Sequence, residues 1–240
     1  NHDLKNEWYE IRNEFYNSGS DSAYAPEIFG DSSAYADVYS ISPKEVAFYI
    51  QDKMEFDDMV INVGVRYDQF DPESVYPSDR RNPANQLILP DSMMSLYPQA
   101  PVISQISPRV GFAYQLGGQA VLHFSYGHFF QMPPMYAMYQ NNSFLVDPNN
   151  FVTRMGNTLL EPEKTITYEI GLWQELNQVM ALDVALFYRD IYNLLTTKTI
   201  STYNQVKYGL YSNKDYGNVR GLELKLDLAM GQLKGMVNYT

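Results

Sequence analysis

Two of the three histidines and a few acidic residues are the side chains of this sequence best suited to metal binding or catalysis. His123 and His128 stand five residues apart. In an extended strand, this odd spacing places the two side chains on opposite faces. A zinc site needs ligands that converge on one ion, so the spacing does not predict such a site. We interpret both histidines as hydrogen-bonded or solvated.

Acid–base chemistry by paired carboxylates has one candidate, Glu161 and Glu163, on either side of Pro162. This pattern is typical of a solvated turn, and we interpret it as one. Residues 147–150 offer oxygen atoms to Ca²⁺ but lack the ligand spacing of a calcium-binding loop. The sequence has no nucleophile elbow, zincin motif or nucleotide-binding loop, and no cysteine. We therefore expect no catalytic residue, no metal and no cofactor, and the chain is not predicted to be an enzyme.

Other charged side chains stand at alternate positions between apolar residues. A strand directs successive side chains to opposite faces, so such an alternation predicts a sheet with one apolar and one polar face. In the stretch 44–56, Val46, Phe48 and Ile50 share the apolar face. The opposite face of the predicted sheet carries six charged residues, which are Arg66, Arg109, Glu169, Asp183, Arg189 and Glu223.

The alternation recurs along most of the chain and predicts about nine strands. A weak strand is expected at 3–15, and clear strands are expected at 44–56, 59–68, 109–116, 122–127, 166–172, 180–189, 222–228 and 233–239. The hairpin arms run for about 9 to 14 residues, and a tilted strand needs about 9–11 residues to cross the hydrocarbon of a membrane. Strands of this length favour a transmembrane sheet over a soluble one.

Short and long connections alternate strictly between the predicted strands. The tight turns fall near 57–58, 117–118, 177–178 and 231–232. The long loops cover about 17–43, 71–107, 131–163 and 196–217. Outer-membrane barrels have short periplasmic turns and longer extracellular loops, so the pattern predicts an all-β, antiparallel, up-and-down transmembrane β-barrel. The six charged residues would then face the lumen, because a charge on the lipid face costs about 2–4 kcal/mol at the midplane.

Composition agrees with a bacterial envelope protein. The chain has 240 residues and a net charge of −11, which argues against a nucleic-acid partner. It has 21 tyrosines, whose amphipathic rings suit membrane interfaces, and it has no run of 18 apolar residues that would form a membrane-spanning helix. An exported protein needs a signal peptide, and none stands at Asn1, so we expect the natural start to lie upstream or to have been removed.

One aromatic and methionine-rich cluster lies at the start of the 131–163 loop. Its candidate ligand-binding residues are Phe130, Met135, Tyr136, Tyr139 and Phe144. One interpretation is an interface girdle with a packed loop behind it. The other is an extracellular surface that contacts a ligand, because aromatic loops on a rigid scaffold favour binding.

Several stretches carry a resemblance to a known family. They are 48–53 (FYIQDK), 63–68 (VGVRYD), 106–112 (ISPRVGF), 125–133 (SYGHFFQMP), 162–164 (PEK) with 168–171 (YEIG), and 213–223, which ends in VRGLE. In this order they resemble the barrel of TonB-dependent outer-membrane receptors, most closely the large Bacteroidetes-type receptors with a carboxypeptidase-regulatory-like N-terminal domain. The resemblance covers residues 40–240 well and the first 40 weakly.

The resemblance implies a barrel of about 22 strands with a plug inside it. It also implies a TonB box, and a nutrient substrate such as a siderophore, cobalamin, glycan or peptide. Its partners would be outer-membrane lipid, its own plug domain and TonB. Neither a plug nor a terminal aromatic strand stands in this sequence, so we expect residues 1–240 to be part of the barrel domain, with plug and C-terminal strands absent.

Two alternatives stay open at this point. A passive porin or adhesin-type barrel would show the same strands without energy coupling, and a plug sequence upstream would separate it from a receptor. A soluble β-rich glycan-binding domain is the other alternative, and recovery of the full-length protein in the soluble periplasm would favour it.

Overall fold

A computed structural model describes residues 3–9, 11–12, 27–28, 30–31, 33, 36–147, 153–214 and 216–240. Residues 148–150 of the stretch considered for Ca²⁺ binding and part of the weak strand predicted at 3–15 lie outside the described residues. In order, the elements are β1 (Leu4–Tyr9), β2 (Ile11–Arg12), β3 (Glu27–Ile28), β4 (Ala36–Ile41), β5 (Lys44–Glu55), β6 (Met59–Asp71), the 3-10 turn η1 (Asp91–Met93), β7 (Ile103–Leu116), β8 (Ala120–Gln131), α1 (Met135–Tyr139), β9 (Arg154–Met155), β10 (Glu163–Asn177), β11 (Met180–Tyr192), β12 (Leu195–Ser201), β13 (Lys207–Asn213), β14 (Tyr216–Met230) and β15 (Leu233–Tyr239).

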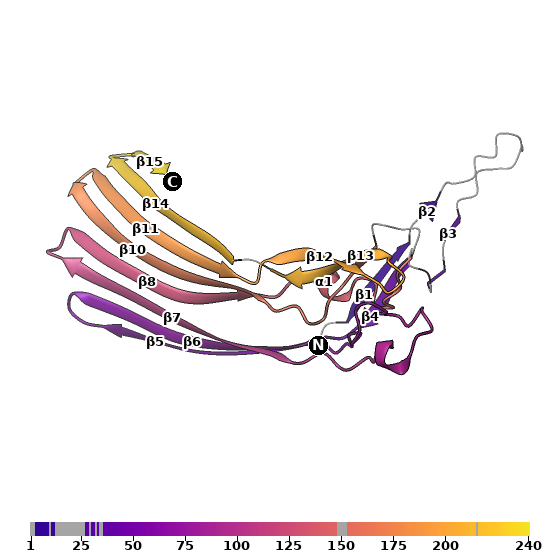
Figure 1. Ribbon diagram of the computed structural model, residues 1–240. Coiled ribbons are helices and arrows are strands. Elements are labelled where there is room, and N and C mark those ends of the chain that lie inside the picture. Colours follow the sequence, from indigo (N-terminus) through magenta and orange to yellow (C-terminus); the bar gives the residue numbers. More distant parts are fainter. Residues whose placement is uncertain are drawn as a thin grey trace, which may run out of the picture.

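The principal sheet has eight antiparallel strands in the order β15-β14-β11-β10-β8-β7-β6-β5. It forms one strongly curved layer, with β5 and β15 at its two edges (Figure 1). All of its strands except β15 have 12 to 15 residues, which is long enough to cross a bilayer at a tilt. The predicted all-β, antiparallel, up-and-down architecture is confirmed.

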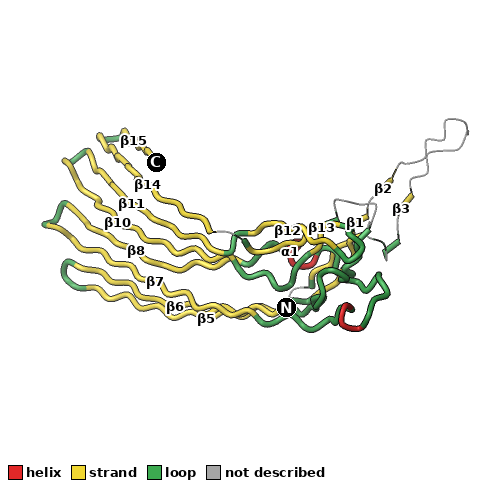
Figure 2. The backbone as a smooth tube through the Cα atoms, viewed as in Figure 1, coloured by secondary structure: helices red, strands yellow, loops and turns green. Residues whose placement is uncertain are grey.

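All tight turns lie at one end of this sheet, and the long connections lie at the other (Figure 2). Gly117, Gly118 and Gly231 have φ angles of 59°, 79° and 59°, a left-handed conformation that residues with a Cβ adopt only at a cost. The tight turns join β5 to β6, β7 to β8, β10 to β11 and β14 to β15 as antiparallel hairpins. Among the described residues, no helix is long and apolar enough to span a membrane.

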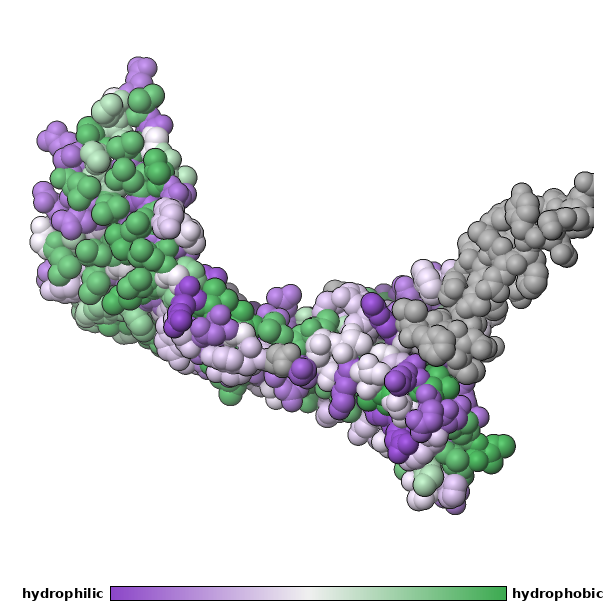
Figure 3. Space-filling view, turned by 45° about the horizontal axis from the view of Figure 1, so that its top comes forward, coloured by the Kyte–Doolittle hydropathy of each residue, from purple (hydrophilic) through white to green (hydrophobic). Residues whose placement is uncertain are grey.

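The strand register carries one apolar face across the whole sheet. One row of directly opposed residues runs through Tyr114, Leu122, Leu172, Val184, Leu224 and Tyr239. Apolar residues gather over the sheet toward the tight turns, whereas the other end of the molecule is mainly polar on the side seen in Figure 3. In the described part of the chain this apolar face is left uncovered, and a water-soluble domain would pack a second layer on it.

The packed interior lies outside the principal sheet, in a region we call the cap. The cap comprises the β1–β4 ribbon, the β12-β13-β9 sheet, helix α1 and the connecting residues 72–102, 132–147 and 153–162 (Figure 1). Buried apolar residues form two clusters there, and the first also includes Phe70 from the end of β6. The first contains Ile41, Phe70, Ala137, Met138, Tyr139, Leu160 and Tyr211, and the second contains Phe144, Val146, Met155, Tyr208 and Leu210.

The structure differs from the sequence-based expectation in and around the cap. The weak first strand is β1, which pairs with β4 and not with the principal sheet. The loops expected at 17–43 and 196–217 contain β4 and the β12–β13 hairpin, and β7 begins at Ile103 inside the expected 71–107 loop. On β13 the consecutive residues Leu210 and Tyr211 are both buried, and β12 carries three threonines, so this hairpin lacks the regular alternation that marks a strand with one lipid-facing side.

Candidate functional site

The polar face of the principal sheet is the concave one. The six charged residues predicted to line a lumen all lie on this face, as the register shows. Arg109, for example, stands in one row with Gly127, Thr167 and Arg189. Glu169 lies opposite Ser125 in the adjacent row.

Some of the charges on this face are paired within the wall. Arg66 makes a salt bridge with Asp68, with Nη2 2.8 Å from Oδ1. Lys225 donates to Asp227 at 2.8 Å, and His123 Nε2 lies 4.0 Å from Glu169 Oε1. At least one side chain of each pair is partly exposed to solvent, which screens the attraction, so these pairs contribute little to stability.

Glycines on the concave face make room for rings of the same strand or of a neighbouring strand. A Cβ at Gly171 would lie 2.2 Å from His123 Nε2, and one at Gly221 would lie 2.6 Å from the Phe187 ring. Gly127 is covered in the same way by the ring of Phe129, at 3.1 Å. The rings therefore lie flat along the wall.

Two hollows open on the concave face. The larger has a volume of about 870 Å³ and is lined by Arg109, Arg189, Ser125, Thr165, Thr167 and Glu169 among others. The smaller has about 300 Å³ and lies where the wall meets the cap, between Glu45, Arg66, Asp68, Ser107, Phe130 and Met135. The Ser107 hydroxyl is buried there without a hydrogen-bond partner.

The five candidate ligand-binding residues divide into two groups. Phe130 and Met135 line the smaller hollow, and Tyr136 is 53% exposed, with its ring 5.8 Å from that of Tyr211. Tyr139 is 0% exposed and donates its hydroxyl to Pro72 O at 3.0 Å.

Phe144 is 7% exposed and stacks on Tyr97, with the ring centroids 5.8 Å apart. Since Tyr139 and Phe144 are packed inside the cap, we assign both a structural role and remove them from the candidate contact surface. Sequence reasoning could not separate the two groups, because all five residues are apolar or aromatic and close in sequence.

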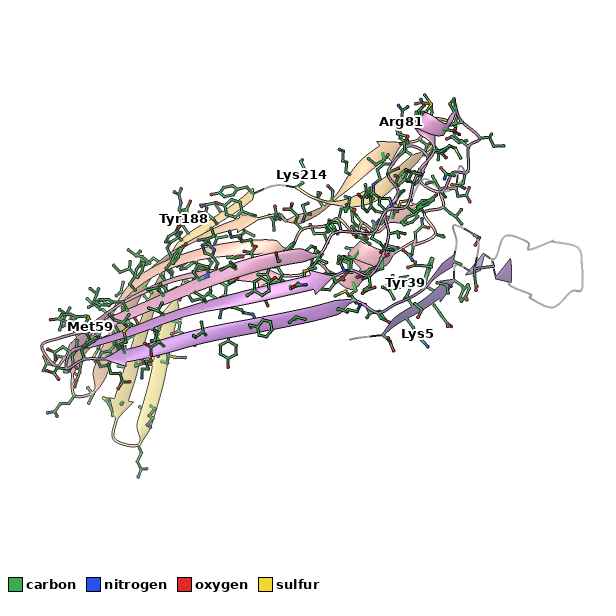
Figure 4. The ribbon with its side chains drawn as sticks, turned by 90° about the horizontal axis from the view of Figure 1, so that it is seen from below. Lys5, Tyr39, Met59, Arg81, Tyr188 and Lys214 are labelled. Carbon is green, nitrogen blue, oxygen red and sulfur yellow. The ribbon has the colours of Figure 1, made fainter. Side chains whose placement is uncertain are left out.

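The connection 72–102 is a structured loop that the sequence did not single out. The Asn82 amide donates to Leu87 O at 3.1 Å and accepts from Leu87 N at 3.2 Å. Asn85 and Ser95 exchange two further hydrogen bonds at 2.9 and 2.7 Å. On this braced loop Ile88 is 99% exposed, and Figure 4 places Arg81 of the same loop at the far end of the cap. The signal available in sequence was the density of Asn, Ser and Pro, which favours side-chain to backbone bonds.

Two half-buried charged side chains form hydrogen bonds within the cap. Asp37 on β4 accepts the backbone N–H of Asn141 at 2.7 Å, and burial raises the pKa of its carboxyl. Arg80 donates to Asn157 at 3.0 Å, its Nη1 is buried without a partner, and burial lowers the pKa of its guanidinium. The hydroxyl of Tyr208 donates to Arg80 O at 2.7 Å.

The residues considered first for chemistry lie apart from one another in the structure. His128 hydrogen-bonds to Tyr126 at 2.6 Å on the apolar face, whereas His123 lies on the concave face, so the prediction of opposite faces is confirmed. Glu161 accepts a hydrogen bond from Asn193 at 3.0 Å and belongs to a connection. No group of three or more metal-ligating side chains occurs within the part of the chain that the structure describes.

Tyrosines mark the end of the apolar face nearest the cap. The rings of Tyr126, Tyr168 and Tyr188 follow one another across β8, β10 and β11, with centroids 5.1 and 6.2 Å apart. Such a row is the aromatic girdle expected where acyl chains meet headgroups. A single layer of long antiparallel strands, with a lipid-type face and a polar concave face, defines the class as wall segments of transmembrane β-barrels.

The particular family follows from sequence. The model of the TonB dependent receptor-like β-barrel family matches residues 1–240, so the chain belongs to this family. A comparison with curated protein sequences gave no match.

Solved structures show the same fold. The hemophore receptor HasR of Serratia marcescens, in complex with its hemophore HasA and heme, is 17% identical with a TM-score of 0.60, over 85% of this chain and 36% of that one. The FrpB iron transporter of Neisseria meningitidis is 15% identical with a TM-score of 0.55, over 83% and 25%. The ferric enterobactin receptor PfeA of Pseudomonas aeruginosa is 14% identical with a TM-score of 0.51, over 85% and 36%. The match therefore covers between a quarter and little more than a third of the length of these three proteins.

Proposed function

We propose that this chain forms part of the barrel wall of a bacterial outer-membrane receptor that imports a nutrient by coupling to TonB. The observation that carries the proposal is the uncovered apolar face of a single-layer sheet in a chain of the TonB-dependent receptor family. In lipid every backbone group needs a partner, so such a wall requires neighbouring strands that close it. A soluble glycan-binding domain would bury that face instead.

The cap is the proposed site of first contact with the nutrient. Supporting this are the exposed ring of Tyr136, the partly exposed Phe130 and Met135 beside the smaller hollow, and the braced loop that presents Ile88. Aromatic and apolar side chains on a rigid scaffold are typical of binding surfaces. The proposed nutrient is one of the classes that the family resemblance implies, which are siderophores, cobalamin, glycans and peptides.

The six charged residues of the concave face would line the lumen. A charge enclosed in a plugged barrel needs a partner, so those near the plug domain would contact it. Glu223 and Asp183 support this part of the proposal, because neither carboxylate forms an ion pair among the described residues and one oxygen of Asp183 is buried without a partner.

Uptake by the full-length receptor tests the proposal. Cells of the native host would be supplied with radiolabelled ferric siderophores, cobalamin, oligosaccharides and oligopeptides, with and without the receptor gene and with and without TonB. We expect one nutrient whose uptake is lost in both deletions. Uptake that needs the receptor but not TonB would indicate a passive porin, and recovery of the protein in the soluble periplasm would refute the membrane assignment.

A further inference from the structure

Two arginines of the concave face differ from three other cations of that face. Arg66, Lys53 and Lys225 each have a carboxylate partner on the wall. Arg109 and Arg189 have neither an ion pair nor a hydrogen bond from their side chains in the part of the chain that the structure describes. The wall therefore leaves two permanent positive charges available, since a guanidinium does not lose its proton at physiological pH.

Each of these arginines lies against an aromatic ring. The guanidinium carbon of Arg109 is 4.7 Å from the centroid of the Phe129 ring, and that of Arg189 is 4.8 Å from the Phe187 ring. Both rings in turn lie over a glycine, Gly127 or Gly221, whose missing side chain creates their space. A ring under a guanidinium attracts the cation and restricts its motion, while the N–H donors at the edge of the group stay free.

The two arginines stand on the same row of the sheet. Gly127 and Thr167 separate them, so their Cα atoms are three strand spacings apart, or about 14 Å. The sheet is concave on this side, which brings the ends of the side chains closer together than their Cα atoms.

Both arginines line the larger hollow, of about 870 Å³, together with the hydroxyls of Ser125, Thr165 and Thr167. Glu169 also lines it, but its carboxylate lies toward His123, with 4.0 Å between Oε1 and Nε2.

We propose that Arg109 and Arg189 form a binding site for a solute that carries two or more carboxylate or phosphate groups as it passes along the barrel wall. Planar guanidinium forks bind such oxyanions in a bidentate manner, and the hydroxyls between them accept or donate to the neighbouring oxygens. This inference rests on the proposed function, because the concave face must line a solute path. The inference assigns Arg109 and Arg189 to solute binding, but not the charged side chains that pair with each other within the wall.

Binding of a defined probe to the purified full-length receptor tests the site. The probe is benzene-1,3,5-tricarboxylate, with benzoate as the single-charge comparison, and calorimetry measures the affinity. We expect the trianion to bind more tightly than benzoate, and Arg109→Gln with Arg189→Gln to weaken it at least about tenfold, as expected for loss of charge-assisted bonds. The matched control is Lys53→Gln with Lys225→Gln, which removes two positive charges from the same face outside the hollow and should change the affinity by less than about twofold.

Three results would overturn the site. The first is equal weakening by the control pair, and the second is absence of tricarboxylate binding to the unaltered receptor, as expected if plug carboxylates already occupy the arginines. The third is undiminished binding by the double variant Arg109→Lys with Arg189→Lys, which would exclude a role for the planar guanidinium groups. This variant keeps both positive charges, and it replaces the glutamine variant if that one does not fold. TonB-dependent uptake that persists beside any of these results would leave the proposed function standing and remove only the anion site.

Discussion

Leu224→Arg in the full-length receptor should impair assembly into the membrane, whereas Lys225→Leu should be tolerated. The two residues are neighbours on β14 but point to opposite faces of the sheet. Leu224 lies opposite Val184 and Tyr239 on the apolar face, and Lys225 lies opposite Asp183 on the concave face. Because the two residues are neighbours on one strand, a comparison of the two variants tests which face of the sheet meets lipid.

The magnitude follows from the position of Leu224 along its strand. It stands midway between Arg220, which is level with the tyrosine girdle, and Leu228, which lies near the tight turn. An arginine facing lipid at the midplane costs about 2–4 kcal/mol, which is roughly 30- to 700-fold in the folding equilibrium. The same change at Leu228 should cost about 0–1 kcal/mol, because the cost falls toward the interface.

Lys225→Leu removes only a partly exposed pair with Asp227, in which the side chains are 45% and 40% exposed. Its expected cost is no more than about 0.2–1 kcal/mol. Folded receptor in the outer-membrane fraction would be counted by heat-modifiable migration, and unfolding free energies would be measured by urea titration in lipid vesicles. If Lys225→Leu proved as damaging as Leu224→Arg, or Leu228→Arg the worst of the three, the assignment of faces and of the lipid-facing band would be refuted.

Three further predictions concern the cap. Gly156→Ala should destabilise it by about 1–3 kcal/mol, because the added Cβ would lie 2.6 Å from the backbone oxygen of Met138; unchanged protease resistance on intact cells would contradict this. Asn82→Ala should make the loop 72–102 susceptible to protease cleavage without loss of receptor from the membrane. The change leaves the backbone N–H and carbonyl of Leu87 without their hydrogen-bond partner, at a cost of about 1–3 kcal/mol. Burial raises the pKa of the Asp37 carboxyl, so this group's contribution to stability is complete below its unfolded-state pKa and is lost as pH rises through its folded-state pKa. Asp37→Asn should therefore make the unfolding free energy, measured by urea titration, depend less on pH in the acidic range. An unchanged pH profile would contradict this prediction.

Much of the principal sheet could be predicted from local pattern. Alternating residues assigned the two faces of β5, β6, β7, β8, β10, β11 and β14, and the register confirms that these faces are continuous from strand to strand. The turns at 117–118 and 231–232 were predictable because glycine readily adopts the left-handed backbone that they require. The cap was not predictable in this way, since its strands and helix pack on several sides and carry no single period.

The sequence by itself determined which side chains share a face, because that depends only on the period of two along one strand. It therefore placed Arg109 and Arg189 on the polar face but could not show that each would lie on a ring above a glycine. Likewise, Tyr136 and Tyr139 looked equivalent, yet one is exposed and the other is buried. Only the tertiary structure decided these points, because pairing and burial depend on residues that other strands and distant loops bring into contact.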